Sequence, residues 1–78
     1  MKKVKLVSTR CYEQGGNAYV QIAVDGAAVR ELSIHEYMDI QSPDYIFDML
    51  ESMGFDYDDE TEIVFCPFAQ TYYERYEA

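Results

Sequence analysis

Residues 42–54 constrain the fold most, because they carry the start signals, the stop signal and the apolar stripe of one amphipathic helix. Ser42 can cap the first turn, Pro43 suits the first helical position, and Gly54 suits the position just beyond the end. Four apolar side chains recur on one side at helical spacing: Ile46, Met49, Leu50 and Met53. A helix with one apolar stripe must bury it against another layer, so we expect the rest of the chain to supply a sheet.

Strand patterns lie on both sides of this helix. Residues 2–9 mix apolar and polar side chains and predict a first strand, and the Gly15-Gly16 pair after it marks a turn. Residues 18–24 alternate, which is typical of a half-buried strand with one apolar face: Val20, Ile22 and Val24. Residues 61–66, beyond the helix, are rich in β-branched and aromatic side chains and predict a further strand.

The dipeptide Asp25-Gly26 predicts a hairpin into a third strand, and the loop length decides which side chains face the core. A two-residue loop would turn Val29 and Glu31 towards the core and leave Leu32 in solvent. A three-residue loop over residues 25–27 turns Leu32 inwards instead. We therefore predict the three-residue loop, with a bulge absorbed inside it.

Two segments are less determined by the sequence. Residues 34–39 predict a short helical turn, because Ser33 and Glu36 have capping-box spacing, although the third strand could equally continue through them. Residues 68–78 fit a helix or a strand, and both stay open. The prediction is a single domain, residues 1–78, of the α+β class. It consists of a small antiparallel sheet of three or four strands in ββ(β)αβ order, with one amphipathic helix packed on one face.

Charge is divided unequally along the chain. Residues 1–30 hold five basic and two acidic side chains, whereas residues 31–78 hold one basic and thirteen acidic side chains. The formal net charge is −9, and residues 31–74 contain no Lys or Arg at all. Because self-repulsion on this scale opposes a compact state, we infer that the negative field has a use.

This acidity excludes some classes of partner. Nucleic acids and anionic membranes would both repel it, so we expect no direct binding to either. The expected partner is instead a protein with a basic, nucleic-acid-handling surface. Cys11 and Cys66 form neither a CxxC pair nor a disulfide framework, and no apolar run reaches the length of a membrane span. These features predict a reduced, cytoplasmic setting.

The expected binding residues gather in the acidic half of the chain. Asp44, Asp48 and Glu51 recur on the polar side of the helix, and five more carboxylates lie within residues 56–62. Tyr45 and Tyr57 are the expected aromatic anchors, because tyrosine rings can stack on Arg and are enriched at interface hot spots. The predicted partner-binding residues are Asp44, Tyr45, Asp48, Glu51, Asp56, Tyr57, Asp58, Asp59, Glu60 and Glu62.

We expect no catalytic residues, no metal site and no cofactor. A calcium loop starting at Asp56 would need Gly at position six and Glu at position twelve, where the sequence has Thr61 and Pro67. His35 is the only histidine, and no catalytic triad can be assembled around it. The chain is therefore predicted not to be an enzyme, with a small metal-dependent or acid–base enzyme kept as a distant alternative.

In its short length, its strong negative charge and its acidic residues 44–62, the chain resembles small acidic inhibitor proteins of phages and mobile elements, including anti-CRISPR and anti-restriction DNA mimics. The resemblance is one of format, without a shared motif or fold. It implies a non-catalytic inhibitor that occupies a basic surface of a partner protein in the host cytoplasm. The alternatives are an antitoxin-like role and a structural or accessory module. In that module acidity serves solubility, and two copies join through a strand edge.

Overall fold

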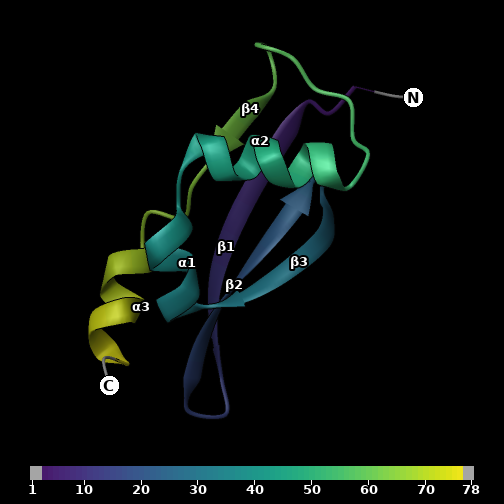
Figure 1. Cartoon of the computed structure of the whole chain (residues 1–78). Helices are drawn as coiled ribbons and strands as arrows, with labels where there is room; N and C mark the ends of the chain where they lie inside the picture. The colour runs from purple at the N-terminus through teal and green to yellow at the C-terminus, as the bar shows by residue number, and fades with distance from the viewer. Residues whose placement is uncertain (1–2, 77–78) are drawn as a thin grey trace.

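The computed structural model describes residues 3–76 and contains a four-stranded sheet and three helices (Figure 1). The elements in chain order are β1 (Leu6–Gln14), β2 (Asn17–Val24), β3 (Ala27–Ser33), α1 (Ile34–Ile40), α2 (Pro43–Ser52), β4 (Glu62–Val64) and α3 (Ala69–Arg75). The predicted α+β class is confirmed. Besides the amphipathic helix that was predicted to pack on the sheet, which is α2, the chain forms the helices α1 and α3. None of the helices in this part of the chain is long and apolar enough to cross a membrane.

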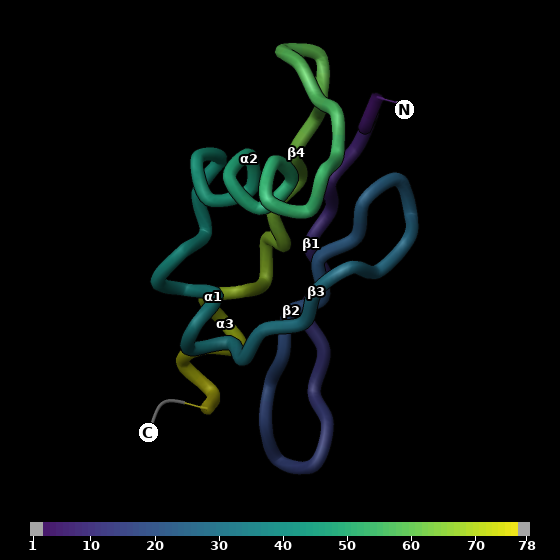
Figure 2. The backbone as a smooth tube through the Cα atoms, turned by 45° about the vertical axis from the view of Figure 1, so that its right-hand side comes forward, coloured from purple at the N-terminus to yellow at the C-terminus, as the bar shows by residue number. Residues whose placement is uncertain are grey.

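The sheet is mixed, which corrects the expectation of an antiparallel sheet. Its order is β3-β2-β1-β4, and β4 pairs with β1 in parallel while the other two pairings are antiparallel. After β3, the helices α1 and α2 return the chain to the edge at which β1 begins, where Val4 N donates to the Asp56 carbonyl (2.8 Å). A strand that starts beside the beginning of β1 runs in the same direction as β1 (Figure 2).

The strand β4 is shorter than the predicted residues 61–66. Its ladder with β1 ends at Val64, which pairs with Ser8. Beyond that point Cys66 N donates to the Thr9 side chain (2.6 Å) rather than to the backbone of β1. Pro67 follows and has no N–H to offer, so pairing cannot resume.

The first hairpin contains the predicted glycine turn, but the strand before it ends later in the sequence than predicted. Gly15 and Gly16 adopt positive φ angles of 61° and 80°, and Gln14 pairs with Asn17 directly across the turn. The tight turn lets pairing continue to its edge, so β1 extends to Gln14 rather than ending near residue 9. Of the predicted residues 2–9, Lys2 lies outside the described part of the chain.

The second hairpin has a two-residue turn, so the predicted three-residue loop is wrong. Asp25 and Gly26 both have positive φ, 49° and 88°, and Val24 pairs with Ala27. The register then shifts within the strands, because Ala28 pairs with Ala23 while Arg30 pairs with Ile22, leaving Val29 as the bulge. Leu32 consequently faces the core beside Val20, as the sequence required, and is 4% exposed.

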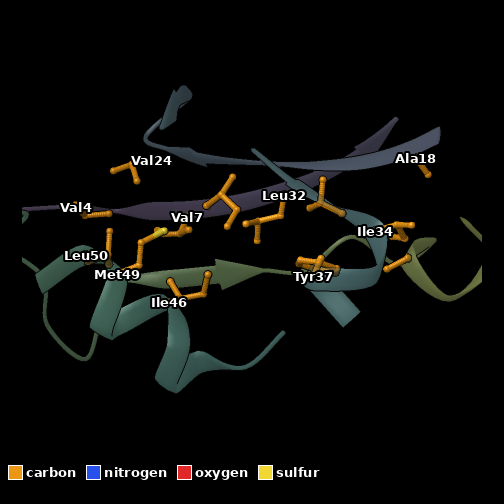
Figure 3. Packing of buried hydrophobic residues seen from close by; sticks show 13 residues of the cluster. Val4, Val7, Ala18, Val24, Leu32, Ile34, Tyr37, Ile46, Met49 and Leu50 are labelled. Atoms are coloured by element: carbon orange, nitrogen blue, oxygen red, sulfur yellow. The ribbon is translucent and has the colours of Figure 1, made fainter. Parts of the chain in front are cut away.

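One core joins the sheet to the helices. The buried side chains lie between the sheet and the helical layer (Figure 3). Contributions come from three strands, the segment before β1 and all three helices: Val4, Val7, Ala18, Val20, Ile22, Val24, Leu32, Ile34, Tyr37, Ile46, Met49, Leu50 and Ala69. The opposite face of the sheet carries half-buried and exposed side chains such as Tyr19, Gln21 and Arg10.

The predicted helix starts are confirmed. The Ser42 hydroxyl accepts a hydrogen bond from Tyr45 N (3.2 Å) at the start of α2. The Ser33 hydroxyl likewise accepts from Glu36 N (3.2 Å), so β3 ends at Ser33 and α1 follows at once. Residues 68–78, which the sequence left open between helix and strand, form the helix α3 over Ala69–Arg75. Of this segment, Glu77 and Ala78 lie outside the described residues.

Leu50→Ala should lower the free energy of unfolding by about 2–5 kcal/mol, because Leu50 is fully buried where α2 packs on the sheet. Met53, just beyond the end of the same helix, is 42% exposed, so Met53→Ala should change the free energy of unfolding by about 0.5 kcal/mol or less. Chemical denaturation followed by circular dichroism measures both variants. Similar losses from the two substitutions would contradict this orientation of α2.

Candidate partner-binding surface

The polar side of α2 carries a row of three exposed carboxylates, Asp44, Asp48 and Glu51. The opposite side of the helix is buried through Ile46, Met49 and Leu50. The row therefore points away from the sheet. At a rise of about 1.5 Å per residue, it extends for about 10 Å along the helix axis.

The loop of residues 53–61 is fastened to α2 at its beginning. Phe55 N donates to the Leu50 carbonyl (2.9 Å), and the Tyr57 ring stacks on Phe47 with 5.0 Å between ring centroids. The loop continues beyond the end of α2 (Figure 1) and carries three further exposed carboxylates: Asp56, which lies beside Lys3 in a parallel bridge, Asp59 and Glu60. We leave Asp56 out and call the other five carboxylates of helix and loop the acidic surface: Asp44, Asp48, Glu51, Asp59 and Glu60.

Lys3 partly neutralises the same loop. Its Nζ lies 2.7 Å from Asp58 Oδ2. Hydrogen bonding to Lys3 holds the pKa of Asp58 below its ordinary 3.8, and the same bond raises the pKa of Lys3 above 10.5. The charge of Asp56 also acts on Lys3, beside which it lies in a parallel bridge. Asp58 is thus ion-paired within the chain, and Asp56 is partly balanced.

Glu62 lies on the other side of the molecule. Its neighbour Ile63 pairs with Val7, which is fully buried in the core. Because successive side chains of a strand point to opposite faces, Glu62 lies on the face that the helices do not cover. The ten predicted binding residues therefore do not form one surface.

The two tyrosines expected as anchors are engaged within the fold. The guanidinium of Arg30 lies over the Tyr45 ring, 5.9 Å from its centroid, and the Tyr45 hydroxyl is buried with no hydrogen-bond partner among residues 3–76. Tyr57 is half-buried in its stack on Phe47. Both rings therefore hold the acidic segments in place, which leaves the carboxylates as the accessible groups.

Two exposed carboxylates of α1 were missing from the predicted set. Glu36 and Asp39 both lie on α1 and are exposed. The capping-box spacing identified Glu36 only as a helix signal, and nothing in the sequence showed that α1 would lie on the same face of the sheet as α2. Arg75, by contrast, lies at the end of α3 and is ion-paired with Glu13. The helix α3 lies near the opposite end of the molecule from the acidic loop (Figure 1).

His35 has a structural role between two helices. Its Nε2 lies 3.0 Å from the Tyr76 carbonyl oxygen, and its ring packs edge-on against Tyr73 with 5.3 Å between centroids. These contacts fasten α3 to the start of α1. Residues 3–76 contain no cluster of three or more His, Cys, Asp or Glu side chains that could hold a metal ion.

One shallow cavity lies away from the acidic surface, and another borders it at Glu60. The first, of about 240 Å³, lies between the start of β2, His35 and Tyr76, and the second, of about 330 Å³, lies between Lys3, Lys5 and Glu60. Comparisons of the chain with protein-family models, curated proteins and solved structures gave no match.

Tyr45→Phe should leave the free energy of unfolding unchanged or raise it, because it removes a buried hydroxyl that lacks a partner. Tyr37→Phe is the matched control, since the Tyr37 hydroxyl is within hydrogen-bond distance of Thr9 Oγ1 (3.2 Å) in the core. That loss should cost about 0.5–1.5 kcal/mol. Denaturation curves for both variants decide the matter, and a larger cost for Tyr45→Phe would contradict the burial of its hydroxyl.

The Lys3–Asp58 pair should make stability depend on pH at both extremes. Because the pKa of Asp58 is lowered by folding, its contribution is present above pH 3.8 and is lost as the pH falls through the folded-state value. Because the pKa of Lys3 is raised, its contribution is present below pH 10.5 and is lost as the pH rises through the folded-state value.

Asp58→Asn tests this dependence, because Asn keeps the oxygen that accepts from Glu60 N (2.9 Å) while losing the charge. The difference in unfolding midpoint between the wild type and this variant should be constant at neutral pH and shrink in acid and in strong alkali. Asp59→Asn, at the exposed neighbour, is the control. A difference that stays unchanged down to the pH at which all carboxyl groups are protonated would contradict the ion pair.

Proposed function

We propose that this chain is a non-catalytic binding protein whose acidic surface occupies a basic surface of a partner protein. The observation that carries the proposal is the set of five exposed carboxylates on α2 and the loop after it, in a stretch of sequence without Lys or Arg. Carboxylates suit Arg in particular, because the guanidinium group can bind them in a bidentate manner.

The partner we propose is one that handles nucleic acid, since its Lys and Arg side chains are already arranged to hold a row of negative charges. Occupying that surface would block phosphate binding by steric exclusion and by charge. Small size and strong acidity support the finer proposal that the chain is a phage-type inhibitor of a host defence complex acting in the cytoplasm, by analogy with DNA mimics.

The internal roles of Tyr45 and Tyr57 change the expected mode of binding. Without exposed aromatic anchors, recognition would depend on the carboxylates and on the shape of the helix–loop edge. Opposite fields would speed encounter, and the affinity would fall steeply as salt rises.

The alternative is an accessory module that self-associates through a strand edge. It is favoured by β3, which is seven residues long and forms one edge of the sheet. An edge strand presents backbone N–H and C=O groups that another chain can pair with. Such an association would not require the acidic surface and would depend far less on salt.

Two charge-matched variants test the proposal. Asp48→Asn/Glu51→Gln/Asp59→Asn removes three charges from the acidic surface, whereas Glu31→Gln/Glu62→Gln/Glu74→Gln removes three charges elsewhere. Glu31 accepts a hydrogen bond from the Tyr12 hydroxyl, and Gln keeps an acceptor there. Affinity capture from host lysate at low and at high salt, followed by mass spectrometry, identifies the partner, which then serves in a DNA-competition assay.

The first variant should compete with DNA about tenfold less well, as expected for the loss of three surface ion pairs of 0.2–1 kcal/mol each. The second should compete nearly as well as the wild type. Equal losses would show that net charge matters rather than the acidic surface, and unchanged competition by the first variant would refute the proposal.

A further inference from the structure

Cys11 and Cys66, far apart in the sequence, are neighbours in the fold. Cys11 lies on β1 opposite Val20, on the face of the sheet that looks towards the core. Because β4 runs parallel to β1 and beside it, the chain beyond Val64 continues along β1 towards Cys11. Cys66 N donates to Thr9 Oγ1 (2.6 Å), and Thr9 precedes Cys11 by two residues on the same face. The side chain of Cys66 lies close enough to that of Cys11 to contribute to raising the pKa of the Cys11 thiol.

The surroundings hold the two residues in this arrangement. Thr9 Oγ1 lies 3.2 Å from the buried Tyr37 hydroxyl as well as accepting from Cys66 N, so a side chain of α1 fixes the same oxygen that holds Cys66. Both cysteines are half-buried, and Cys66 adjoins the exposed residues Pro67 and Phe68. A small reagent can therefore approach the pair from the side of Cys66.

We propose that Cys11 and Cys66 form a reversible intramolecular disulfide when the protein meets a low-molecular-weight disulfide such as oxidised glutathione. The Cys66 thiolate attacks one sulfur of the reagent, so that one glutathione thiolate leaves and a mixed disulfide forms. The Cys11 thiolate then attacks the Cys66 sulfur and expels the second glutathione thiolate. Two protein thiols are oxidised, the reagent is reduced to two thiols, and the two protons pass to solvent and to the leaving thiolates.

The order of attack follows from the environment of Cys11. Burial and the neighbouring Cys66 raise the pKa of Cys11 to about 12, so Cys11 remains a thiol at neutral pH. The nucleophile is the thiolate, which makes Cys66 the residue that reacts first. Once Cys66 is part of the mixed disulfide, its thiol and its charge no longer raise the pKa of Cys11. At mildly alkaline pH Cys11 then loses its proton to solvent, and the thiolate resolves the mixed disulfide from within the fold.

The crosslink would join β1 to the segment that leads into α3. In the reduced protein α3 is held to the rest of the chain by the burial of Ala69 in the core and by side-chain contacts near its end, where Arg75 and the Tyr76 hydroxyl donate to Glu13. A disulfide that closes a loop of more than fifty residues restricts the unfolded chain and so stabilises the fold. This inference does not depend on the acidic surface or on its partner.

The test is oxidation of the full chain by oxidised glutathione at mildly alkaline pH, with Cys11→Ser and Cys66→Ser as matched variants. Intact mass under non-reducing conditions should show the loss of two hydrogens without a glutathione adduct, and thiol titration should fall from two groups to none. Dithiothreitol should reverse both changes. The oxidised wild type should melt several degrees above its reduced form. Cys11→Ser should instead stop at the glutathione adduct, and neither variant should lose two hydrogens.

The same chain oxidised in urea serves as the control for the reagent. If the unfolded chain forms the intramolecular disulfide while the folded protein keeps both thiols, the proposal is overturned. It is also overturned if the folded protein gives only glutathione adducts or disulfide-linked dimers.

Discussion

The burial of one side of α2 against the sheet determines which side chains of the helical layer face solvent. Ile46, Met49 and Leu50 occupy the core, and this fixes the rotation of the helix about its axis. Once the rotation is fixed, Asp44, Asp48 and Glu51 must face outwards. No Lys or Arg accompanies them on α2, so the hydrophobic contact that stabilises the fold also assembles the row of negative charge.

The basic N-terminal segment reduces the negative charge of the loop of residues 53–61, which follows α2. Lys3 holds Asp58, while the Thr61 hydroxyl donates to the Val4 carbonyl (2.8 Å) and ties the end of the loop to the strand region before β1. The Phe47–Tyr57 stack ties its beginning to α2. The loop is therefore anchored at both ends, and Asp59 and Glu60 remain exposed between the anchors. Part of the charge counted from the sequence is used within the fold, and the remainder forms the acidic surface.

Local signals in the sequence predicted most of the elements, and long-range contacts account for what they missed. The caps at Ser33 and Ser42 act over three residues, and the turns at Gly15-Gly16 and Asp25-Gly26 depend on their own φ angles, so each is readable from a short window. The parallel course of β4 depends on the path of the whole chain. The bulge at Val29 turns the Leu32 side chain towards the core, an effect that was predicted to come from a three-residue loop.

The candidate surface could be predicted only in part for the same reason. Helical periodicity correctly grouped Asp44, Asp48 and Glu51. It could not show that Arg30 would cover Tyr45, that Lys3 would hold Asp58, or that Glu62 would face the uncovered side of the sheet. The nearby positions of Cys11 and Cys66 likewise arise from the parallel pairing of β4 with β1.

The most direct test of the central claim measures the electrostatic potential itself, without a partner. Paramagnetic relaxation of amide protons by a cationic and by an anionic nitroxide cosolute reports the local potential at each residue. We expect strong enrichment of the cationic over the anionic cosolute at residues 44–51 and 59–60, and little or none around Arg10 and Gln21 on the uncovered face of the sheet. A similar ratio over both faces would contradict a negative surface concentrated on α2 and its loop.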